Sequence, residues 1–243
     1  MERIDLQIIA AGNRKTPAVW QQPCITNIQR LYYIKGGTGY IHTEDGGRIP
    51  FEKNSIYIFP HNLPQIFEAD NRDPLDHIYF DFLSTPPIIA PEPLVYRVIP
   101  QSTLEGAVAF FGGLLQDRQK EESGEKQRLL SAALELLLRL LDKESPLPLS
   151  QDRVIARALA YIHGHYRAPL TVAELARREG FAPNAFIRRF KRVMGQTPYA
   201  YLKDYRLMRA AALLKEGMTV ARAAELVGYE NASSLSRALA KKG

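Results

Sequence analysis

Polar and apolar positions alternate with a two-residue period along the first third of the chain. This period is typical of strands that bury one face, and turn-forming residues separate the alternating segments. The segments cover residues 31–34, 39–42, 55–59 and 77–82. Short strands joined by tight turns predict an antiparallel sandwich or a small barrel within residues 1–100.

The period changes to that of a helix near Leu104. Two apolar stripes, one ending at Leu115 and one reaching Leu141, predict a helical hairpin over residues 101–143. The helix expected over 126–143 carries too many leucines for a helix that is buried on one side only. The hairpin packs either on its own barrel or on a second copy of the chain, and the leucine count favours a homodimer.

Two prolines within residues 144–151 oppose helix formation and predict an extended linker. Everything from residue 152 to residue 243 has helical periodicity. We therefore expect an all-α second domain after the linker.

A pattern that occurs twice dominates this second domain. Thr171 and Val172 begin the first copy, Thr219 and Val220 begin the second, and the offset is 48 residues up to the turn and 49 beyond it. Each copy combines a helix with small apolar residues, a turn glycine and a second helix with polar outer positions. This arrangement is typical of the helix-turn-helix, and a tandem pair predicts a reader of double-stranded DNA.

One continuous helix is expected between the two copies, from residue 198 to residue 216. About 18 residues span roughly 27 Å, and recognition helices about 34 Å apart can enter successive major grooves. We expect Thr171 to cap the first helix and Pro183 to open the first recognition helix. The core side of that recognition helix is expected to hold Phe186, Phe190 and Val193.

The outer positions near the start of a recognition helix are where base edges are contacted. In the first copy they are Asn184, Ala185, Ile187 and Arg188. Three basic residues share the same helix: Arg189, Lys191 and Arg192. Each of these three is either a DNA contact or an ordinary solvated charge.

Charge is unevenly divided along the chain, whose net charge is +6. Residues 1–149 hold 15 Lys and Arg against 19 Asp and Glu, a net charge of −4, and residues 150–243 hold 17 against 7, a net charge of +10. The positive half predicts a polyanionic partner, because bound cations release counterions from phosphates. No apolar run approaches a membrane span and the start lacks a secretory signal, so we expect a cytoplasmic protein with no membrane partner. The single cysteine, Cys24, is expected to be a free thiol.

The C-terminal region resembles the DNA-binding domain of the AraC family of bacterial transcription regulators. The matching positions include 170–176, Phe186, Arg188, Phe190, 195–198, Arg206, Gly228, Tyr229 and Arg237. The resemblance implies base contacts by Asn184, Ile187 and Arg188 in the first copy, and by Ala232, Ser233 and Arg237 in the second. Arg188 and Arg237 are favoured, since a guanidinium can bind O6 and N7 of guanine together. RNA polymerase is a candidate partner.

This region departs from the family pattern at several positions. Ala182 stands where Ser or Thr usually caps the first recognition helix, and a missing cap costs about 1 kcal/mol. The second recognition helix carries only short side chains over 232–234. We therefore expect the first copy to supply more of the base discrimination.

The N-terminal segments 31–41, 55–60 and 78–82 resemble the cupin-like sensor barrel of the same family. That resemblance implies a small-molecule effector, such as a sugar or a related metabolite. Aromatic side chains are the candidate lining of an effector pocket, although aromatic residues on strands are more often simple core. The candidates are Tyr32, Tyr40, Tyr57, Phe59 and Phe67.

The combined prediction is an α+β multidomain protein with a cupin-like antiparallel β-barrel, a helical hairpin and an all-α double helix-turn-helix domain. The expected function is sequence-specific transcription regulation under an effector. One alternative is a regulator whose barrel only dimerises. Another is a metal-dependent cupin enzyme, which needs clustered imidazole and carboxylate ligands. His42, His61 and His77 are scattered along the chain, so we expect no catalytic residue, metal or cofactor.

Overall fold

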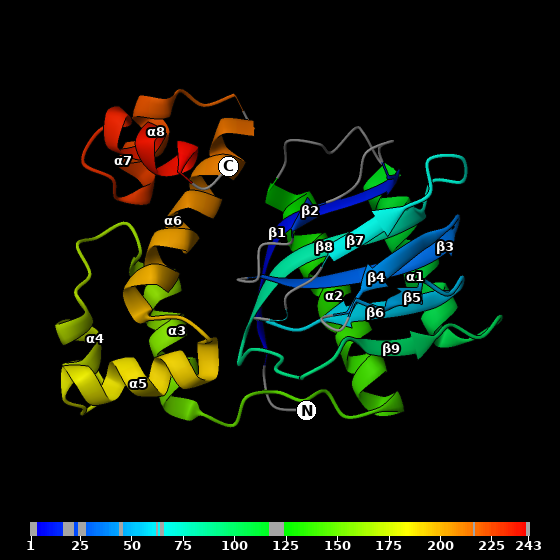
Figure 1. Cartoon of the computed structure of the whole chain (residues 1–243), viewed down its shortest axis with the longest axis horizontal. Coiled ribbons are helices and arrows are strands. Elements are labelled where there is room, and N and C mark those ends of the chain that lie inside the picture. Colours follow the sequence, from blue (N-terminus) through cyan, green and yellow to red (C-terminus); the bar gives the residue numbers. More distant parts are fainter. Residues whose placement is uncertain are drawn as a thin grey trace. The chain divides into compact units, whose positions relative to one another are not determined.

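A computed structural model describes residues 4–16, 22–23, 28–43, 46–61, 63, 66–116, 124–215 and 217–241. The chain forms two compact units, Met1–Leu149 and Ser150–Gly243. The first unit holds the strands and the helical hairpin, and the second unit is made of helices (Figure 1). Cys24 lies outside the described residues.

The first unit contains two antiparallel sheets. The larger sheet has the order β1 (Asp5–Lys15), β8 (Asp76–Thr85), β3 (Gln29–Gly36), β6 (Ser55–Phe59) and β9 (Leu94–Arg97). The smaller sheet has the order β2 (Gln22–Pro23), β7 (Ile66–Ala69), β4 (Gly39–His42) and β5 (Arg48–Pro50). The predicted α+β class is confirmed.

The strands form two separate sheets instead of the closed barrel that we expected. The reason lies at Gly37, where the chain leaves the larger sheet and enters the smaller one. Gly37 has a φ of +81°, and a Cβ at this position would lie 2.3 Å from the carbonyl oxygen of Pro74. Only glycine fits such a turn. After it, β4 pairs with β5 and β7, so the ladder of the larger sheet is not continued.

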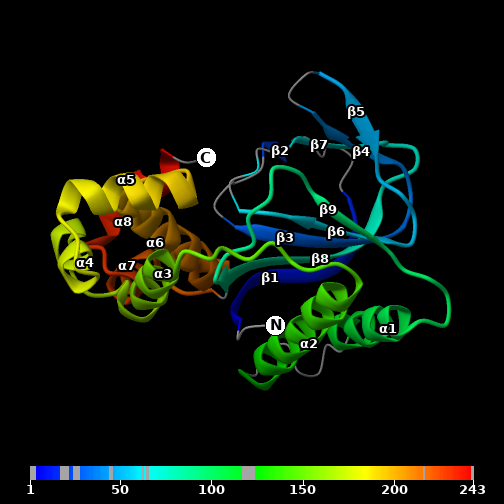
Figure 2. The same ribbon diagram turned by 90° about the horizontal axis from the view of Figure 1, so that it is seen from below.

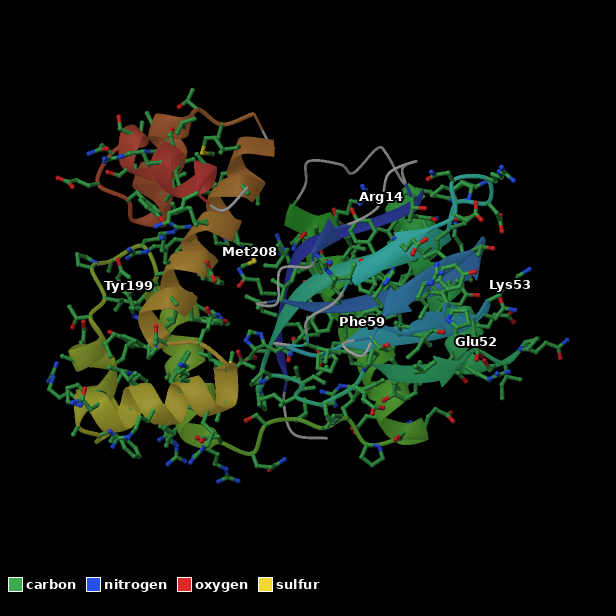
Figure 3. The ribbon with its side chains drawn as sticks, in the orientation of Figure 1. Arg14, Glu52, Lys53, Phe59, Tyr199 and Met208 are labelled. Carbon is green, nitrogen blue, oxygen red and sulfur yellow. The ribbon has the colours of Figure 1, made fainter. Side chains whose placement is uncertain are left out.

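Both faces of the larger sheet are covered, and β6 shows how its side chains are divided. All five residues of β6 are buried. Ile56 and Ile58 pack in one cluster with the helices, whereas Tyr57 and Phe59 pack in another cluster with residues of the smaller sheet. Phe59 lies inside this unit, and Glu52 and Lys53 lie at its rim (Figure 3). Alternate residues of β6 therefore point into two different cores, and not into one core and the solvent.

Helices α1 (Thr103–Gln116) and α2 (Gly124–Glu144) cover one face of the larger sheet (Figure 2). Their buried residues join the cluster that contains Ile56 and Ile58. These residues are Leu104, Val108, Phe111, Leu130, Ala133, Leu134, Leu137, Leu138 and Leu141. The sequence left open whether the hairpin packs on its own barrel or on a second copy of the chain. In the structure the hairpin packs on the larger sheet of its own chain.

The segment after α2 is attached to the first unit. Leu147 is buried in the same core as the α2 leucines, and its amide donates a hydrogen bond of 2.8 Å to Asp142 Oδ1. The amide of Ile89 donates a hydrogen bond of 2.9 Å to the carbonyl oxygen of Pro148. The first part of the expected linker is therefore docked, because an apolar side chain reaches the core.

The second unit consists of α3 (Arg153–His165), α4 (Val172–Arg178), α5 (Pro183–Met194), α6 (Pro198–Lys215), α7 (Val220–Val227) and α8 (Ala232–Ala240). The expected long helix between the repeats is confirmed as α6, which runs from the α3–α5 bundle to the α7–α8 pair (Figure 1). Among the described helices of both units, none has the length and apolar character needed to cross a bilayer.

Candidate nucleic-acid interface

Both helix-turn-helix copies begin with the same capping interaction. Thr171 Oγ1 accepts a hydrogen bond from the Glu174 amide at 3.1 Å, and Thr219 Oγ1 accepts one from the Arg222 amide at 3.3 Å. The predicted N-cap at Thr171 is therefore confirmed. Each threonine satisfies an amide that would otherwise lack a partner at a helix start.

The turn glycine of each copy has a positive φ. Gly180 has a φ of +77° and Gly228 has a φ of +81°. Residues with a side chain rarely adopt this conformation. The two glycines thus set the same change of direction between the first helix and the recognition helix of each copy.

Helix α5, the first recognition helix, buries Phe186, Phe190 and Met194. Of the three residues expected on the core side, Phe186 and Phe190 are buried and Val193 is half-buried, and the four-residue spacing continues to the buried Met194. The helix begins with Pro183 at its first position, as predicted, and its N-cap residue Ala182 makes no side-chain hydrogen bond.

The four predicted outer positions of α5 differ in their exposure. Asn184 and Arg188 are exposed, and Ala185 and Ile187 are half-buried. Arg188 makes no hydrogen bond or ion pair with any other described residue. A guanidinium in this state is available to a ligand at no cost to an internal contact.

Lys191 and Arg192 are exposed near the C-terminal end of α5. Arg189 differs from both, because its guanidinium Nε lies 2.8 Å from Asp152 Oδ2 and its Cζ lies 5.3 Å from the centre of the Phe181 ring. The exposed fraction of the Asp152 side chain is 11%. Arg189 thus ties α5 to the start of α3, which sets it apart from the other predicted DNA contacts.

Asp152 is also the N-cap of α3, since its Oδ1 accepts a hydrogen bond of 3.2 Å from the Ile155 amide. Burial alone would raise the pKa of Asp152, but hydrogen bonds from Arg189 and from the Ile155 amide outweigh burial and hold the pKa below its ordinary value. The carboxylate is therefore charged at neutral pH, and it joins a helix cap to an ion pair.

Helix α8, the second recognition helix, is capped by Asn231, whose Oδ1 accepts a hydrogen bond of 2.9 Å from the Ser234 amide. Leu235 is fully buried beneath it. Ser233 and Arg237 are exposed, and Ala232 is half-buried. Arg237 contacts the Ser233 carbonyl oxygen and Ser234 Oγ at 3.4 and 3.5 Å. These distances are at the limit of a hydrogen bond, so the guanidinium is held loosely.

The candidate effector residues of the first unit divide into two groups. Four of them pack together between the sheets: ring centres lie 5.4 Å apart for Tyr32 and Phe59, 4.9 Å for Phe59 and Phe67, and 6.2 Å for Tyr57 and Phe59. Tyr40 lies beside Ile41 on β4, and Ile41 belongs to this core. Because neighbouring residues of a strand point to opposite faces, Tyr40 lies on the outer face of the smaller sheet.

A polar pair that the sequence did not reveal lies on the same face of the larger sheet as Tyr32. Arg30 and Asp81 are register partners on β3 and β8, and Arg30 Nε lies 2.8 Å from Asp81 Oδ1. Their side chains have exposed fractions of 12% and 18%. The two residues are 51 positions apart, so only the strand register brings them together.

The three histidines of the first unit lie in different surroundings. His42 Nε2 is 2.9 Å from Glu68 Oε2, and His61 and His77 are buried. Burial lowers the pKa of His77 to about 4. Within the part of the chain that the structure describes, no three His, Cys, Asp or Glu side chains are grouped closely enough to hold a metal ion.

Comparisons with known proteins match this second unit. A family model described as a helix-turn-helix domain matches residues 175–242. The chain is 36% identical over 81 residues to the HTH-type transcriptional regulator YobQ of Bacillus subtilis, covering 33% of this chain and 34% of YobQ. It is 40% identical over 86 residues to a putative AraC-like transcription regulator of Streptomyces lividans, covering 35% of this chain and 28% of that protein. These alignments span about a third of each relative's length.

Two longer comparisons include the first unit. The MmsAB operon regulatory protein of Pseudomonas aeruginosa is 24% identical over 217 residues, covering 87% of this chain and 71% of that protein. The fold is similar to that of ToxT from Vibrio cholerae, with a TM-score of 0.58 and 10% sequence identity, covering 97% of this chain and 93% of ToxT.

The fold and the site define the class of protein: a sheet unit with a helical hairpin, followed by a tandem helix-turn-helix of the type found in transcription regulators. Residues 175–242 form a helix-turn-helix domain, and the second unit is similar to AraC-like transcription regulators. The three curated relatives described above are regulators by name.

Proposed function

We propose that this protein binds double-stranded DNA in a sequence-specific manner and thereby regulates transcription. The observation that carries the proposal is a pair of capped helix-turn-helix units joined by the single helix α6. Each unit presents exposed polar or basic residues on its second helix. Two such helices on one connecting helix fit a bipartite site in successive major grooves.

Affinity and specificity have different sources in this proposal. The 17 Lys and Arg residues after position 149 supply contacts to phosphates, which are strong at low salt and carry no sequence information. Base discrimination comes from Asn184, Ala185, Ile187 and Arg188 on α5, with Ala232, Ser233 and Arg237 on α8 adding less. Lys191 and Arg192 are placed for backbone contacts.

The test uses the full chain and a pool of random DNA duplexes. Repeated selection at low salt should enrich a site with two conserved boxes, and the logarithm of the affinity should fall linearly with the logarithm of the salt concentration. A chain that enriches no sequence, or that has no affinity for any duplex at low salt, would contradict the proposal. Single-stranded DNA serves as the control for charge alone.

We further propose that the first unit binds a small effector between its sheets. The support is the packing of Tyr32, Phe59 and Phe67 beside the half-buried Arg30 and Asp81, which together offer apolar and charged contacts. One solved structure shows wild-type ToxT bound to an unsaturated fatty acid. Sugars and related metabolites, as well as fatty acids, are therefore the compounds to screen.

A thermal-shift screen of these compounds tests the effector proposal. A ligand present at 100 times its Kd stabilises the folded protein by about 2.7 kcal/mol, which raises the unfolding temperature. The variant Tyr32→Phe keeps the ring and removes the hydroxyl group, so a smaller shift in this variant would assign the ligand to this core. If no compound shifts the transition, the first unit acts as a dimerisation module without a ligand.

Partners and location follow from the DNA-binding proposal. A regulator of transcription works beside the chromosome, which in bacteria places it in the cytoplasm. A homodimer with α1 and α2 at its interface is part of the proposal, because Phe110 and Leu136 on these helices have exposed fractions of 56% and 51%. RNA polymerase remains a predicted partner.

A further inference from the structure

The turn glycines of the two helix-turn-helix copies occupy different surroundings. A Cβ at Gly180 would meet no described atom within 4 Å. A Cβ at Gly228 would lie 2.5 Å from the carbonyl oxygen of Arg167 and 3.1 Å from that of Tyr166. The turn of the second copy is therefore seated directly on the backbone that follows α3, and α3 packs in the bundle of the first copy.

A second element holds the same stretch of backbone. Arg206, near the middle of α6, donates a hydrogen bond of 2.7 Å from Nε to the Tyr166 carbonyl oxygen. Its Nη2 donates another of 2.8 Å to the Ala168 carbonyl oxygen. Carbonyl groups at the end of a helix lack intrahelical partners and carry partial negative charge. A half-buried guanidinium with a fixed fork of donors suits them better than any other side chain.

The residues 166–168 continue directly from α3, which packs against α5 of the first copy, and they also contact α6. The Tyr166 ring lies 4.9 Å from the Tyr205 ring in an edge-to-face contact. The Ala168 amide donates a hydrogen bond of 2.9 Å to the His165 carbonyl oxygen. This stretch is thus a short bridge: it continues from α3, it is held by α6, and the α7–α8 turn rests on its carbonyl groups.

We propose that Arg206 and Gly228 are positioning residues that fix the second recognition helix relative to the first, through the bridge at residues 166–168. Neither residue needs to touch DNA. Through these two residues, the copies are connected by residues 166–168 as well as by α6. This second connection prevents α8 from rotating about the end of α6. The rigid connection between the copies does not depend on the proposed function. Its consequence does rest on that function: the protein should tolerate only one spacing between its two DNA boxes.

The DNA experiment measures spacing preference with the full chain and the bipartite duplex selected by the wild type. Duplexes with one, two or three base pairs inserted between the boxes are compared with the selected spacing. For a rigid pair of readers, each insertion should weaken binding by roughly tenfold or more. Arg206→Met should bind single boxes like the wild type and lose most of this preference, and Arg206→Lys should retain part of it. Lys203→Met, one turn earlier on α6, is the matched control and should keep the preference.

The two glycines provide a second matched pair. Gly180→Ala and Gly228→Ala create similar backbone strain, because both positions have a φ near +80°, but only Gly228→Ala pushes against the bridge. We expect Gly228→Ala to relax the spacing preference and Gly180→Ala to preserve it. The inference is overturned if Arg206→Met and Gly228→Ala, shown by circular dichroism to be folded, both discriminate spacing like the wild type.

A measurement without DNA separates this inference from the proposed function. Because the chain has a single cysteine, Cys24→Ser clears the background for spin labels at Arg192 and Ala240, which are exposed on α5 and α8. A narrow distance distribution is expected in this background and a broader one after Arg206→Lys. A broad distribution without the Arg206 change would refute the rigid bridge even if the protein binds DNA well. A narrow one in a protein that selects no DNA would refute only the proposed function.

Discussion

Arg188 and Arg189 are neighbours of the same residue type on α5, and their different surroundings predict different roles. Arg188 is exposed, whereas Arg189 is held by Asp152. We predict that Arg188→Ala weakens specific binding by about 1–3 kcal/mol and relaxes the preference at one base pair. Fluorescence titration of the selected duplex and its single-base variants measures both effects.

Arg189→Ala is the control for this prediction. It should lower the unfolding temperature, because Asp152 would be left half-buried without its partner. The pattern of preferred bases should stay the same. Loss of base preference in Arg189→Ala, with none in Arg188→Ala, would reverse the two assignments.

The buried His77 makes stability depend on pH. Burial is the main reason that its pKa falls from 6.5 to about 4. Below pH 6.5 the unfolded chain binds a proton at this ring that the folded chain does not bind, so the free energy of unfolding decreases as the pH falls towards about 4. The lost stability amounts to about 3 kcal/mol.

The corresponding experiment is urea denaturation across this pH range. His77→Gln should show a shallower dependence on pH than the wild type, because glutamine does not titrate. His165→Gln makes the same substitution at an exposed position of the other unit, and it is the control for the effect of the substitution itself. Equal pH profiles for wild type and His77→Gln would show that this ring does not cause the effect.

At the scale of elements, α5 is the recognition helix without a side-chain cap. Ala182 already has the extended backbone of an N-cap residue, with a φ of −65° and a ψ of 143°. Ala182→Ser should therefore stabilise the protein by about 1 kcal/mol without moving the backbone. Thermal unfolding checks the prediction, with Thr171→Ala as the opposite change on α4. A lower unfolding temperature for Ala182→Ser would show that the hydroxyl group does not cap α5.

The sequence predicted the elements with strong periodicity and missed those with weak periodicity. The four strands that it located became β3, β4, β6 and β8. It missed β1, whose residues are mostly half-buried and whose register shifts between Ile8 and Ala10, so its alternation is faint. It indicated no more than an irregular or edge segment over residues 84–100, where β9 forms an edge of the larger sheet. Periodicity detects one buried face, and these strands do not have a clear one.

The candidate site shows the same limit in its side chains. The helical period predicted that Asn184 and Arg188 face outward, because that property is local to α5. The ion pair of Arg189 with Asp152 spans 37 positions, and the bonds from Arg206 to the backbone after α3 span about as many. Contacts between distant segments depend on how the helices pack, and a single sequence does not state this.

At the scale of the whole molecule, the unequal contribution to DNA binding that we predict for the two helix-turn-helix copies favours a dimer. The second recognition helix carries short side chains, so we expect few base contacts from one chain. Two chains on adjacent sites multiply the affinity through their high effective concentration. The outer surface of the hairpin is the candidate interface, because it exposes Phe110 and Leu136 on helices that otherwise bury their large apolar residues in the core.

We predict that Leu136→Asp weakens dimerisation by at least about tenfold, because burying a leucine contributes about 1.5–3 kcal/mol and a two-fold interface contains each substitution twice. Sedimentation equilibrium of the full chain measures the change. Ile99→Asp is the matched control, since Ile99 has an exposed fraction of 67% and lies outside both helices. A wild type that is monomeric at micromolar concentration would contradict the dimer. A Leu136→Asp variant that remains dimeric would place the interface elsewhere, and the DNA affinity of this variant would then stay at the wild-type level.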